Sequence, residues 1–195
     1  MVALEPVTGA AIAPHLDALA ALRIAVFREY PYLYEGSLDY ERRYLATYAA
    51  SPDSLVVLAR DGARVIGAAT AMPAAQHADE VAPALARAGY AVEDVCYFGE
   101  SVLDAAYRGQ GVGRAFFDHR ERHARERGFR TAAFCAVARP ADHPRRPPSY
   151  VPHDAFWTRR GFVRRPDVTT SFAWRDLDDA DETAKPMVFW IKDLA

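Results

Sequence analysis

The sequence predicts one domain of the α/β or α+β class, with helices packed on a mixed β-sheet. The chain has 195 residues, which is about the length of one domain and enough to bury a core without disulfides or metal. Hydrophobic residues make up 51% and charged residues 26%, a composition typical of globular proteins and not of disordered chains. Helix-like and strand-like patterns alternate along the chain, which is typical of helices covering a sheet. We therefore expect a single domain over residues 1–195.

The first part of the chain predicts two helices and a hairpin. Apolar residues spaced by four, four and three predict a helix over 12–28, with one face made of Leu16, Ala20, Ile24 and Phe27. An aromatic, turn-rich loop follows at 30–36, and a second helix fits 38–50, before Ser51-Pro52. Two apolar runs, 55–59 and 65–71, flank an Asp61-Gly62 turn and predict a β-hairpin.

The middle of the chain predicts a strand, a long helix and another strand. Residues 74–89 are alanine-rich and weakly helical up to Gly89. A strand fits 95–103, and Gly99 within it indicates a bulge or a close backbone approach. The long helix is predicted over 111–128 and the following strand over 131–137.

The C-terminal part predicts a loop, a short helix and two strands. Five prolines between 139 and 152 predict a long loop and not a domain linker, because too little chain follows for a second core. A short helix fits 153–160, and strands fit 168–175 and 186–192. We expect the acidic loop between these strands to be solvated; its acidic residues are Asp176, Asp178, Asp179, Asp181 and Glu182.

Charge and cysteine content exclude several classes of partner. The net charge of −2 gives no overall attraction to nucleic acid or to anionic membranes. No apolar run approaches the ~18 residues of a membrane span, and the N-terminus lacks the basic start of a secretory signal. Cys96 and Cys135 fit no zinc spacing, and we expect them to be buried thiols. We expect a cytoplasmic, metal-free protein that binds neither nucleic acid nor membrane.

Arginine dominates the basic residues. Of 24 basic residues, all are arginine except Lys185 and Lys192. Because the arginines are scattered and alanine is also abundant, we interpret this as a compositional bias of the genome and not as an anion-binding surface.

One segment carries a chemical signature: Arg108-Gly109-Gln110-Gly111-Val112-Gly113, between a predicted strand and a predicted helix. Glycines let a ligand approach the backbone, and the free amides of a helix start attract anions. Arg108 can add charge to the same anion. The Gly-Lys-Ser/Thr ending of a Walker loop is missing, and Arg114 stands where a Rossmann turn needs its third glycine. With these two kinds of loop excluded, the segment fits a turn with the pattern Arg-x-x-Gly-x-Gly that binds phosphate or pyrophosphate.

At these residues the chain resembles the GNAT superfamily of N-acetyltransferases. The segment from Tyr107 to Gly113 is similar to the family's acetyl-CoA pyrophosphate loop, and Phe156–Phe162 is similar to its late helix ending in Gly-Phe. The predicted order of elements resembles the family fold over nearly the whole chain. The resemblance implies a mostly antiparallel central sheet with a splayed pair of strands, flanked by helices.

The resemblance also implies how acetyl-CoA would be bound. The backbone of Ser101, Val102 and Leu103 would pair with the pantetheine arm. Arg108 and the amides around 109–114 would hold the pyrophosphate; these residues are Gly109, Gln110, Gly111, Val112, Gly113 and Arg114. One departure concerns the late helix, where the family often has a tyrosine that protonates the CoA thiolate. This chain has Trp157 there, and an indole cannot act as that acid.

Two residues of the predicted strand are candidates for catalysis. An amine acceptor arrives largely protonated, so its proton needs a route. Glu100 lies just before the expected cofactor contacts and is our candidate general base. The alternatives are that its carboxylate pairs with an arginine or faces water. Tyr97 could orient substrate or water, or simply belong to the core.

Other polar residues are weaker candidates. Tyr30, Tyr32 and Tyr34 could recognise a flat or cationic acceptor, or could pack as an ordinary lid. His119 and His123 lie one turn apart without a third metal ligand, so we expect a solvated face, while His143 and His153 lie in or beside the proline-rich loop and could approach a site.

Together these observations predict an N-acetyltransferase that moves an acetyl group from acetyl-CoA directly to a primary amine. The acceptor is expected to be a small molecule or a peptide, and its identity stays open, as does the choice between monomer and homodimer. Two alternatives remain at this stage. One is a non-catalytic module that binds or senses acyl-CoA, and the other is an interaction protein in which the glycines only form a tight turn.

Overall fold

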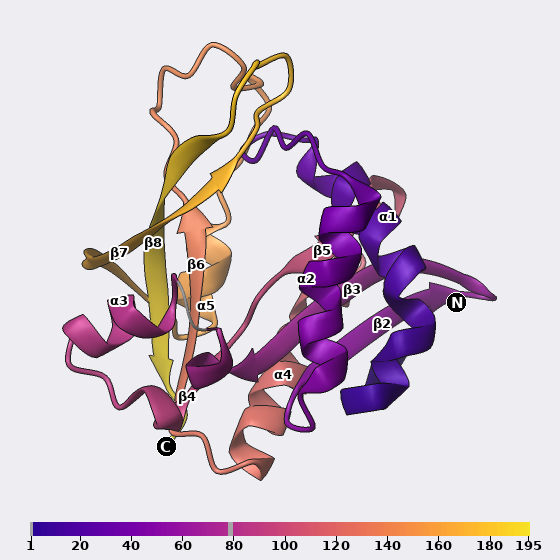
Figure 1. Cartoon of the computed structure of the whole chain (residues 1–195), viewed down its shortest axis with the longest axis vertical. Coiled ribbons are helices and arrows are strands. Elements are labelled where there is room, and N and C mark those ends of the chain that lie inside the picture. Colours follow the sequence, from indigo (N-terminus) through magenta and orange to yellow (C-terminus); the bar gives the residue numbers. More distant parts are fainter. Residues whose placement is uncertain (1, 78–79) are drawn as a thin grey trace.

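The chain forms one open, mostly antiparallel sheet in the computed structural model, which describes residues 2–77 and 80–195 (Figure 1). The order of strands is β1-β2-β3-β4-β6-β8-β7, and β5 pairs with β3. Among the described strands, only β4 and β6 run parallel. The strands are β1 (Ala3–Val7), β2 (Leu55–Asp61), β3 (Arg64–Pro73), β4 (Val95–Tyr97), β5 (Ser101–Leu103), β6 (Thr131–Val137), β7 (Val163–Trp174) and β8 (Thr183–Asp193).

Helices cover both faces of this sheet. The side chains of β2 alternate: Val56 and Leu58 pack in one core cluster with residues of α1 and α2, whereas Leu55, Val57 and Ala59 pack with residues of α4. The sheet is therefore the middle of three layers. The α-helices are α1 (Leu16–Phe27), α2 (Leu38–Ala50), α3 (Ala82–Arg87), α4 (Val112–Glu126) and α5 (Asp154–Arg159); the 3₁₀ helices are η1 (Gly9–His15), η2 (Ala74–Gln76), η3 (Val92–Asp94) and η4 (Ala105–Tyr107).

Most of the elements predicted from sequence are confirmed. The helix 38–50, the hairpin, the strand 131–137 and the loop 139–152 lie where they were expected, and the long helix is two residues shorter at its C-terminal end. The expected face of the first helix is partly wrong, because the buried residues of α1 are Leu19, Ala20 and Arg23. The weakly helical segment 74–89 contains η2 and α3, while residues 78–79 lie outside the described part.

Four strand predictions need correction. The strand predicted over 95–103 is two strands, β4 and β5, interrupted at 98–100. β1 was not predicted, since a five-residue run containing Glu5 and Pro6 carries little strand signal. β7 begins at Val163 and not at 168, because a register shift between Arg165 and Thr169 accommodates Pro166 inside the strand. β8 begins at Thr183 and not at 186.

Two side chains predicted to be solvated are buried. Asp176, in the acidic loop, is 7% exposed and pairs with Arg139 and Lys185. His123 is buried against the turn that precedes β2, and its Nε2 lies 2.9 Å from the carbonyl oxygen of Asp53 in that turn. The prediction that Cys96 and Cys135 are buried thiols is confirmed.

One stretch, Gly9–Phe27, is by length and composition able to cross a membrane, with 19 residues and a mean hydropathy of 1.5. Core helices and signal sequences share these properties, so this is weak support for a membrane span. In the fold the stretch packs against α2, β3 and β5. The expected absence of membrane contact and the cytoplasmic location stay predictions.

Candidate active site

The sheet opens between β5 and β6. β4 pairs with β3 on one side and with β6 on the other, and the Phe98 amide still donates to the carbonyl of Ala133 at 2.8 Å. Beyond Phe98 the next strand, β5, pairs only with β3, while β6 continues along β8. Two neighbouring strands thus separate at Gly99, and each leaves one edge unpaired. The splayed strand pair that the sequence resemblance implied is present.

Gly99 is required at the point of divergence. A Cβ atom there would clash with the Tyr48 hydroxyl and lie 2.6 Å from Thr70 Oγ1. The Gly99 amide donates to the Thr70 carbonyl at 3.2 Å. The close backbone approach predicted for Gly99 is confirmed, and it allows the chain to turn from β4 into β5.

Backbone groups of β5 face the opening. The backbone amide of Thr70 donates to the Glu100 carbonyl at 3.0 Å, and the backbone amide of Asp104 donates to the Ile66 carbonyl at 2.9 Å. Because bonding to the partner alternates along an antiparallel strand, Val102 also points its amide toward β3. The amides of Ser101 and Leu103 therefore point away from β3, toward the gap.

The glycine turn precedes α4 and presents open backbone. Gly111 is the N-cap of α4 with a φ of 84°, and the first helical bond runs from the Ala115 amide to the Gly111 carbonyl at 3.1 Å. The amides of Val112, Gly113 and Arg114 thus have no partner within the helix. A Cβ at Gly109, Gly111 or Gly113 would meet no atom within 4 Å. Open space, free amides and the helix dipole fit a pyrophosphate group.

Arg108, by contrast, is already engaged. Its Nη1 and Nη2 donate to the two carboxylate oxygens of Glu29 at 2.8 and 2.9 Å, and its Nε donates to the Leu103 carbonyl at 3.2 Å. The side chain of Gln110 donates to the Ala106 carbonyl at 3.3 Å, while Arg114 is 77% exposed.

Glu100 is buried on the face covered by α1 and α2. Its Oε2 lies 2.7 Å from Nη1 of Arg23 and accepts a hydrogen bond from the Tyr44 hydroxyl at 3.2 Å. Its Oε1 is buried without a hydrogen-bond partner among the described residues. Burial and the neighbouring Glu100 carboxylate raise the pKa of Tyr44, so this hydroxyl stays protonated and donates. One carboxylate oxygen of Glu100 is thus fixed in position by two partners.

Arg23 is shared with a second buried carboxylate. Its Nε donates to Oε2 of Glu41, a fully buried residue of α2 whose Oε1 also has no partner among the described residues. Burial alone would lower the pKa of Arg23, but Glu100 and Glu41 raise it overall. Glu41 and Glu100 thus meet at one guanidinium, and a second one, that of Arg120 from α4, bonds to the backbone carbonyl of Glu100.

Arg120 supports the same strand from the α4 side. It is 2% exposed, and its Nη2 donates to Ser101 Oγ at 2.8 Å while Nη1 donates to the Glu100 carbonyl at 3.3 Å. Its guanidinium also lies over the rings of Phe98 and Phe117. Burial lowers its pKa to about 10, so it remains charged at neutral pH. Arg120 therefore fixes the backbone at the start of β5.

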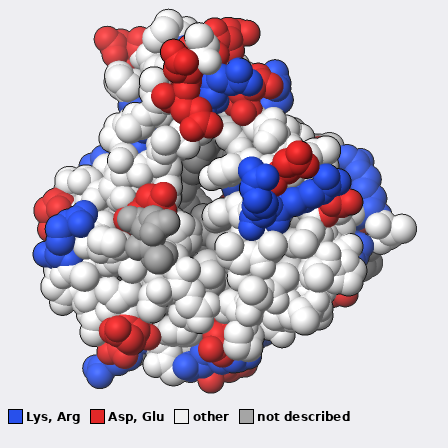
Figure 2. Space-filling view, viewed as in Figure 1, with Lys and Arg blue, Asp and Glu red and all other residues white. Residues whose placement is uncertain are grey.

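A hollow lies between the α1–α2 layer and strands β6–β8 (Figures 1 and 2). Ring contacts connect the two sides: His77 lies 6.3 Å from Tyr44 of α2, 4.9 Å from Tyr97 of β4 and 6.1 Å from Phe172 of β7, between ring centroids. Tyr97 is buried, and its hydroxyl lies 3.1 Å from Sγ of Cys135. Tyr97 thus forms part of an aromatic wall, and its predicted catalytic role stays a prediction.

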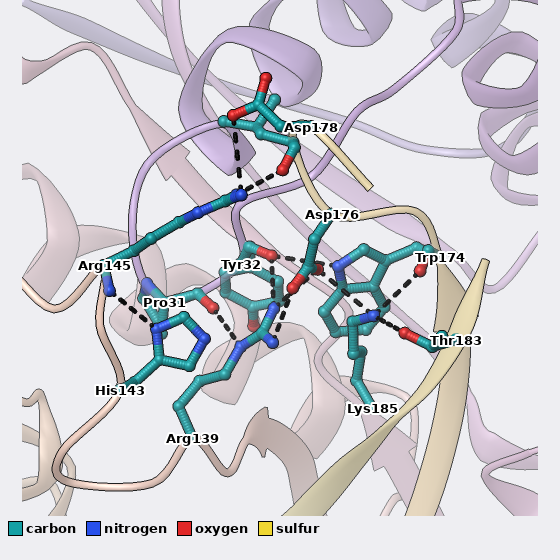
Figure 3. Close-up of polar contacts among 11 residues, drawn as sticks. Pro31, Tyr32, Arg139, His143, Arg145, Trp174, Asp176, Asp178, Thr183 and Lys185 are labelled. Carbon is teal, nitrogen blue, oxygen red and sulfur yellow. Dashed lines mark hydrogen bonds and ion pairs between the residues drawn. The ribbon is translucent and has the colours of Figure 1, made fainter. Parts of the chain in front are cut away.

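The aromatic loop after α1 is held over this region by Arg139 (Figure 3). The guanidinium of Arg139 donates to the carbonyls of Pro31 and Tyr32 at 2.9 Å each and pairs with both carboxylate oxygens of Asp176 at 2.8 Å. Lys185 lies 3.4 Å from the same carboxylate. Backbone bonds add to this, since Leu177 donates to the Leu33 carbonyl at 2.7 Å. The loop is joined to the β7–β8 connection.

The three tyrosines of this loop are all half-buried. The Tyr32 ring packs between Phe27 and Trp174, and Tyr30 packs edge-on against Tyr150 of the proline-rich loop. Burial, and Glu41 beside it, raise the pKa of Tyr34. The loop is therefore packed, and the role of its tyrosines in recognising an acceptor stays a prediction.

The remaining candidates divide by location. His153 lies at the N-cap of α5, 5.7 Å from the Trp157 ring, and burial together with Arg108 lowers its pKa. His143 contacts Tyr30 in the proline-rich loop. No group of three or more metal-ligating side chains occurs among the described residues. Trp157 itself packs against Phe134 and Trp190.

Sequence reasoning missed Arg23, Glu41, Tyr44, Arg120 and Arg139. The signal that could have found Arg23 and Glu41 is a charged residue on the apolar face of a helix, because charged side chains are almost never fully buried unless they are paired. Arg139 lies in a loop and carries no such signal.

A sequence model of the acetyltransferase (GNAT) family matches residues 19–162. The chain belongs to the GNAT acetyltransferase family. Members use acetyl-CoA as acyl donor, so this chain is an N-acetyltransferase that uses acetyl-CoA, and the splayed strands and glycine turn fit that cofactor. Membership favours an enzyme over the non-catalytic alternatives. None of the curated proteins matches the sequence.

Solved structures share the GNAT fold over the whole chain. An N-acetyltransferase from Staphylococcus aureus Mu50 aligns with a TM-score of 0.64 and 14% identity, covering 100% of this chain and 99% of that one. A ribosomal-protein-alanine N-acetyltransferase from Brucella melitensis aligns with a TM-score of 0.62 and 16% identity, covering 98% and 99%. The Salmonella typhimurium protein yncA, solved with its cofactor acetyl-CoA, aligns with a TM-score of 0.60 and 10% identity, covering 100% and 95%. At these identities the likeness concerns the fold.

Proposed function

We propose that this chain, as one acetyltransferase domain, transfers an acetyl group from acetyl-CoA directly to a primary amine, with Glu100 as the general base. The observation that carries the proposal is the Glu100 carboxylate, buried where the strands separate. One of its oxygens is fixed by Arg23 and Tyr44, and the other has no partner among the described residues. A fixed carboxylate with a free oxygen is suited to take a proton, directly or through one water.

The cofactor side of the proposal depends on backbone groups. The open turn at Gly109, Gly111 and Gly113 supports binding of the pyrophosphate, and the outward amides of Ser101 and Leu103 support pairing with the pantetheine arm. The Leu103 amide is also the donor we assign to the thioester carbonyl. Acetyl-CoA supplies the activated acetyl group, and the chain contributes by holding donor and acceptor together.

The acceptor side depends on the hollow between α2 and β7. Aromatic rings from Tyr44, Tyr97 and Phe172 meet around His77, and the Tyr44 hydroxyl also donates to the Glu100 carboxylate. Such surroundings favour an acceptor that arrives as an ammonium ion. We keep Tyr30, Tyr32 and Tyr34 as proposed walls of this site.

A panel of primary amines with acetyl-CoA tests the function, with release of free CoA thiol as the readout. The Glu100→Gln variant keeps the shape of the side chain but cannot take a proton. Because general-base catalysis contributes about 10²–10⁴-fold, we expect kcat to fall by that order while CoA affinity, measured by calorimetry, stays unchanged. A Glu100→Gln variant with wild-type kcat would remove Glu100 from the mechanism, and absence of CoA binding to the wild type would refute the function itself.

A further inference from the structure

The guanidinium of Arg108 is occupied at all three nitrogens. Glu29 accepts from Nη1 and Nη2 in a bidentate arrangement, at 2.8 and 2.9 Å, and Leu103 accepts from Nε at 3.2 Å. Bidentate pairing of guanidinium and carboxylate is geometrically the same as its pairing with phosphate. The arginine that begins the glycine turn therefore has its charge already matched by a carboxylate.

Both hydrogen-bond partners of Arg108 matter for the proposed cofactor site. The Leu103 carbonyl belongs to the same strand, β5, whose backbone we assign to the pantetheine arm. The Glu29 carboxylate occupies the Nη1–Nη2 edge of the guanidinium, an edge that can equally pair with a phosphate. Both side chains of the pair are about half exposed, at 45% for Arg108 and 50% for Glu29. The pair is therefore weak enough to be displaced by a more highly charged anion.

Glu29 is also the start of the aromatic loop. Its backbone carbonyl accepts from the amides of Tyr32 and Leu33 at 3.1 Å each, directly after the end of α1. The far part of the loop is held by Arg139 at Pro31 and Tyr32. The far part of the loop is thus attached to Arg139, Trp174 and Leu177, whereas Glu29 joins the start of the loop to the cofactor turn through Arg108.

We propose that Glu29 is a positioning residue that holds Arg108 away from the pyrophosphate, and that binding of acetyl-CoA transfers Arg108 from Glu29 to the phosphates. This rests on the proposed function, since it assumes that the turn at 109–114 binds CoA. The exchange releases the Glu29 carboxylate, so occupation of the cofactor site is communicated to the start of the acceptor loop. No covalent step is involved, and the two anions compete for one cation.

Calorimetric titration with CoA at low salt tests this, because the readout needs no acceptor. Glu29→Gln frees Arg108, and we expect CoA to bind about threefold more tightly, within the range measured for exposed ion pairs. A purely structural role for Glu29 would leave affinity unchanged or weaken it. In an Arg108→Gln background the same Glu29→Gln change is expected to have no effect, because the competition no longer exists.

Asp17→Asn is the matched control. Asp17 lies in the first turn of α1, whereas Glu29 follows the end of that helix; Asp17 is exposed and pairs with Arg42 at 2.7 Å, so this variant removes the same charge at a distant position. We expect wild-type CoA affinity. The proposal is overturned if Glu29→Gln fails to tighten binding, or if it tightens binding equally with and without Arg108, which would indicate a general charge effect. Failure of the wild type to bind CoA would instead refute the proposed function.

Discussion

Replacement of Gly111 by aspartate tests the cofactor turn at its centre. Gly111 is the N-cap of α4 with a φ of 84°, in the left-handed region that side-chain-bearing residues avoid. A Cβ there meets no atom within 4 Å, so the cost to the fold comes from the backbone and not from a clash. That cost is about 1–2 kcal/mol. For a chain of 195 residues it corresponds to a decrease in Tm of about 2–8 °C, which leaves a folded protein.

The effect on CoA affinity has a different origin. The new carboxylate would stand beside the free amides of Val112, Gly113 and Arg114, where we place the pyrophosphate. Two unit charges roughly 6 Å apart repel by about 1.4 kcal/mol at an effective dielectric constant of about 40, between the values for water and for a protein surface. This is a tenfold loss of affinity, and a doubly charged pyrophosphate makes it a lower limit.

Calorimetric titration of CoA, with a thermal melt of each variant, separates the two effects. Gly111→Ala carries the backbone strain without the charge, so its Tm should fall as in Gly111→Asp while its affinity falls less. Gly113→Ala has neither strain nor charge, because Gly113 does not have a positive φ and its Cβ position is open. We expect it to retain stability. Wild-type CoA affinity in folded Gly111→Asp would show that the pyrophosphate does not bind at this turn.

Two further predictions concern stability and can be measured by chemical denaturation. Gly99→Ala would place a methyl group against the Tyr48 hydroxyl and Thr70, which should lower the free energy of unfolding by about 1–3 kcal/mol; an unchanged value would contradict the close approach. Arg139→Gln would leave the buried Asp176 carboxylate with only Lys185, at a cost of about 3 kcal/mol. Burial alone would raise the pKa of Asp176, but Arg139 and Lys185 lower it overall. The wild type should therefore lose this contribution as pH falls below about 4, and the variant should show a smaller acid dependence.

Local patterns predicted most of the fold. Runs of apolar residues located β2, β3 and β6, because these strands are buried along most of their length, and Ser51-Pro52 marked the end of α2. β1 and the start of β7 were not predicted, because both contain proline and charged residues. Such residues fit a strand only at the edge of a sheet or at a register shift, and both of these depend on the neighbouring strands. Pairing partners are fixed by the whole sheet and not by the strand's own sequence.

The cofactor turn could be predicted, whereas the polar network around Glu100 could not. The turn is contiguous in sequence, and its glycines carry the information. The network combines Arg23 of α1, Glu41 and Tyr44 of α2, and Arg120 of α4, which meet only when three helices pack on the sheet. Similarly, the pairing of Arg108 with Glu29 joins residues 79 positions apart.

The chain's two lysines both form ion pairs. Lys185 is 4% exposed and lies beside Asp176, and Nζ of Lys192 pairs with Glu121 at 2.7 Å. Every other basic side chain is a histidine or an arginine, and neither offers a primary amine. An enzyme whose substrate is a reactive thioester thus presents almost no nucleophilic side-chain amine of its own. We therefore expect little acetylation of this protein's own side chains, and amine-directed labelling of the folded protein should report mainly on the α-amino group.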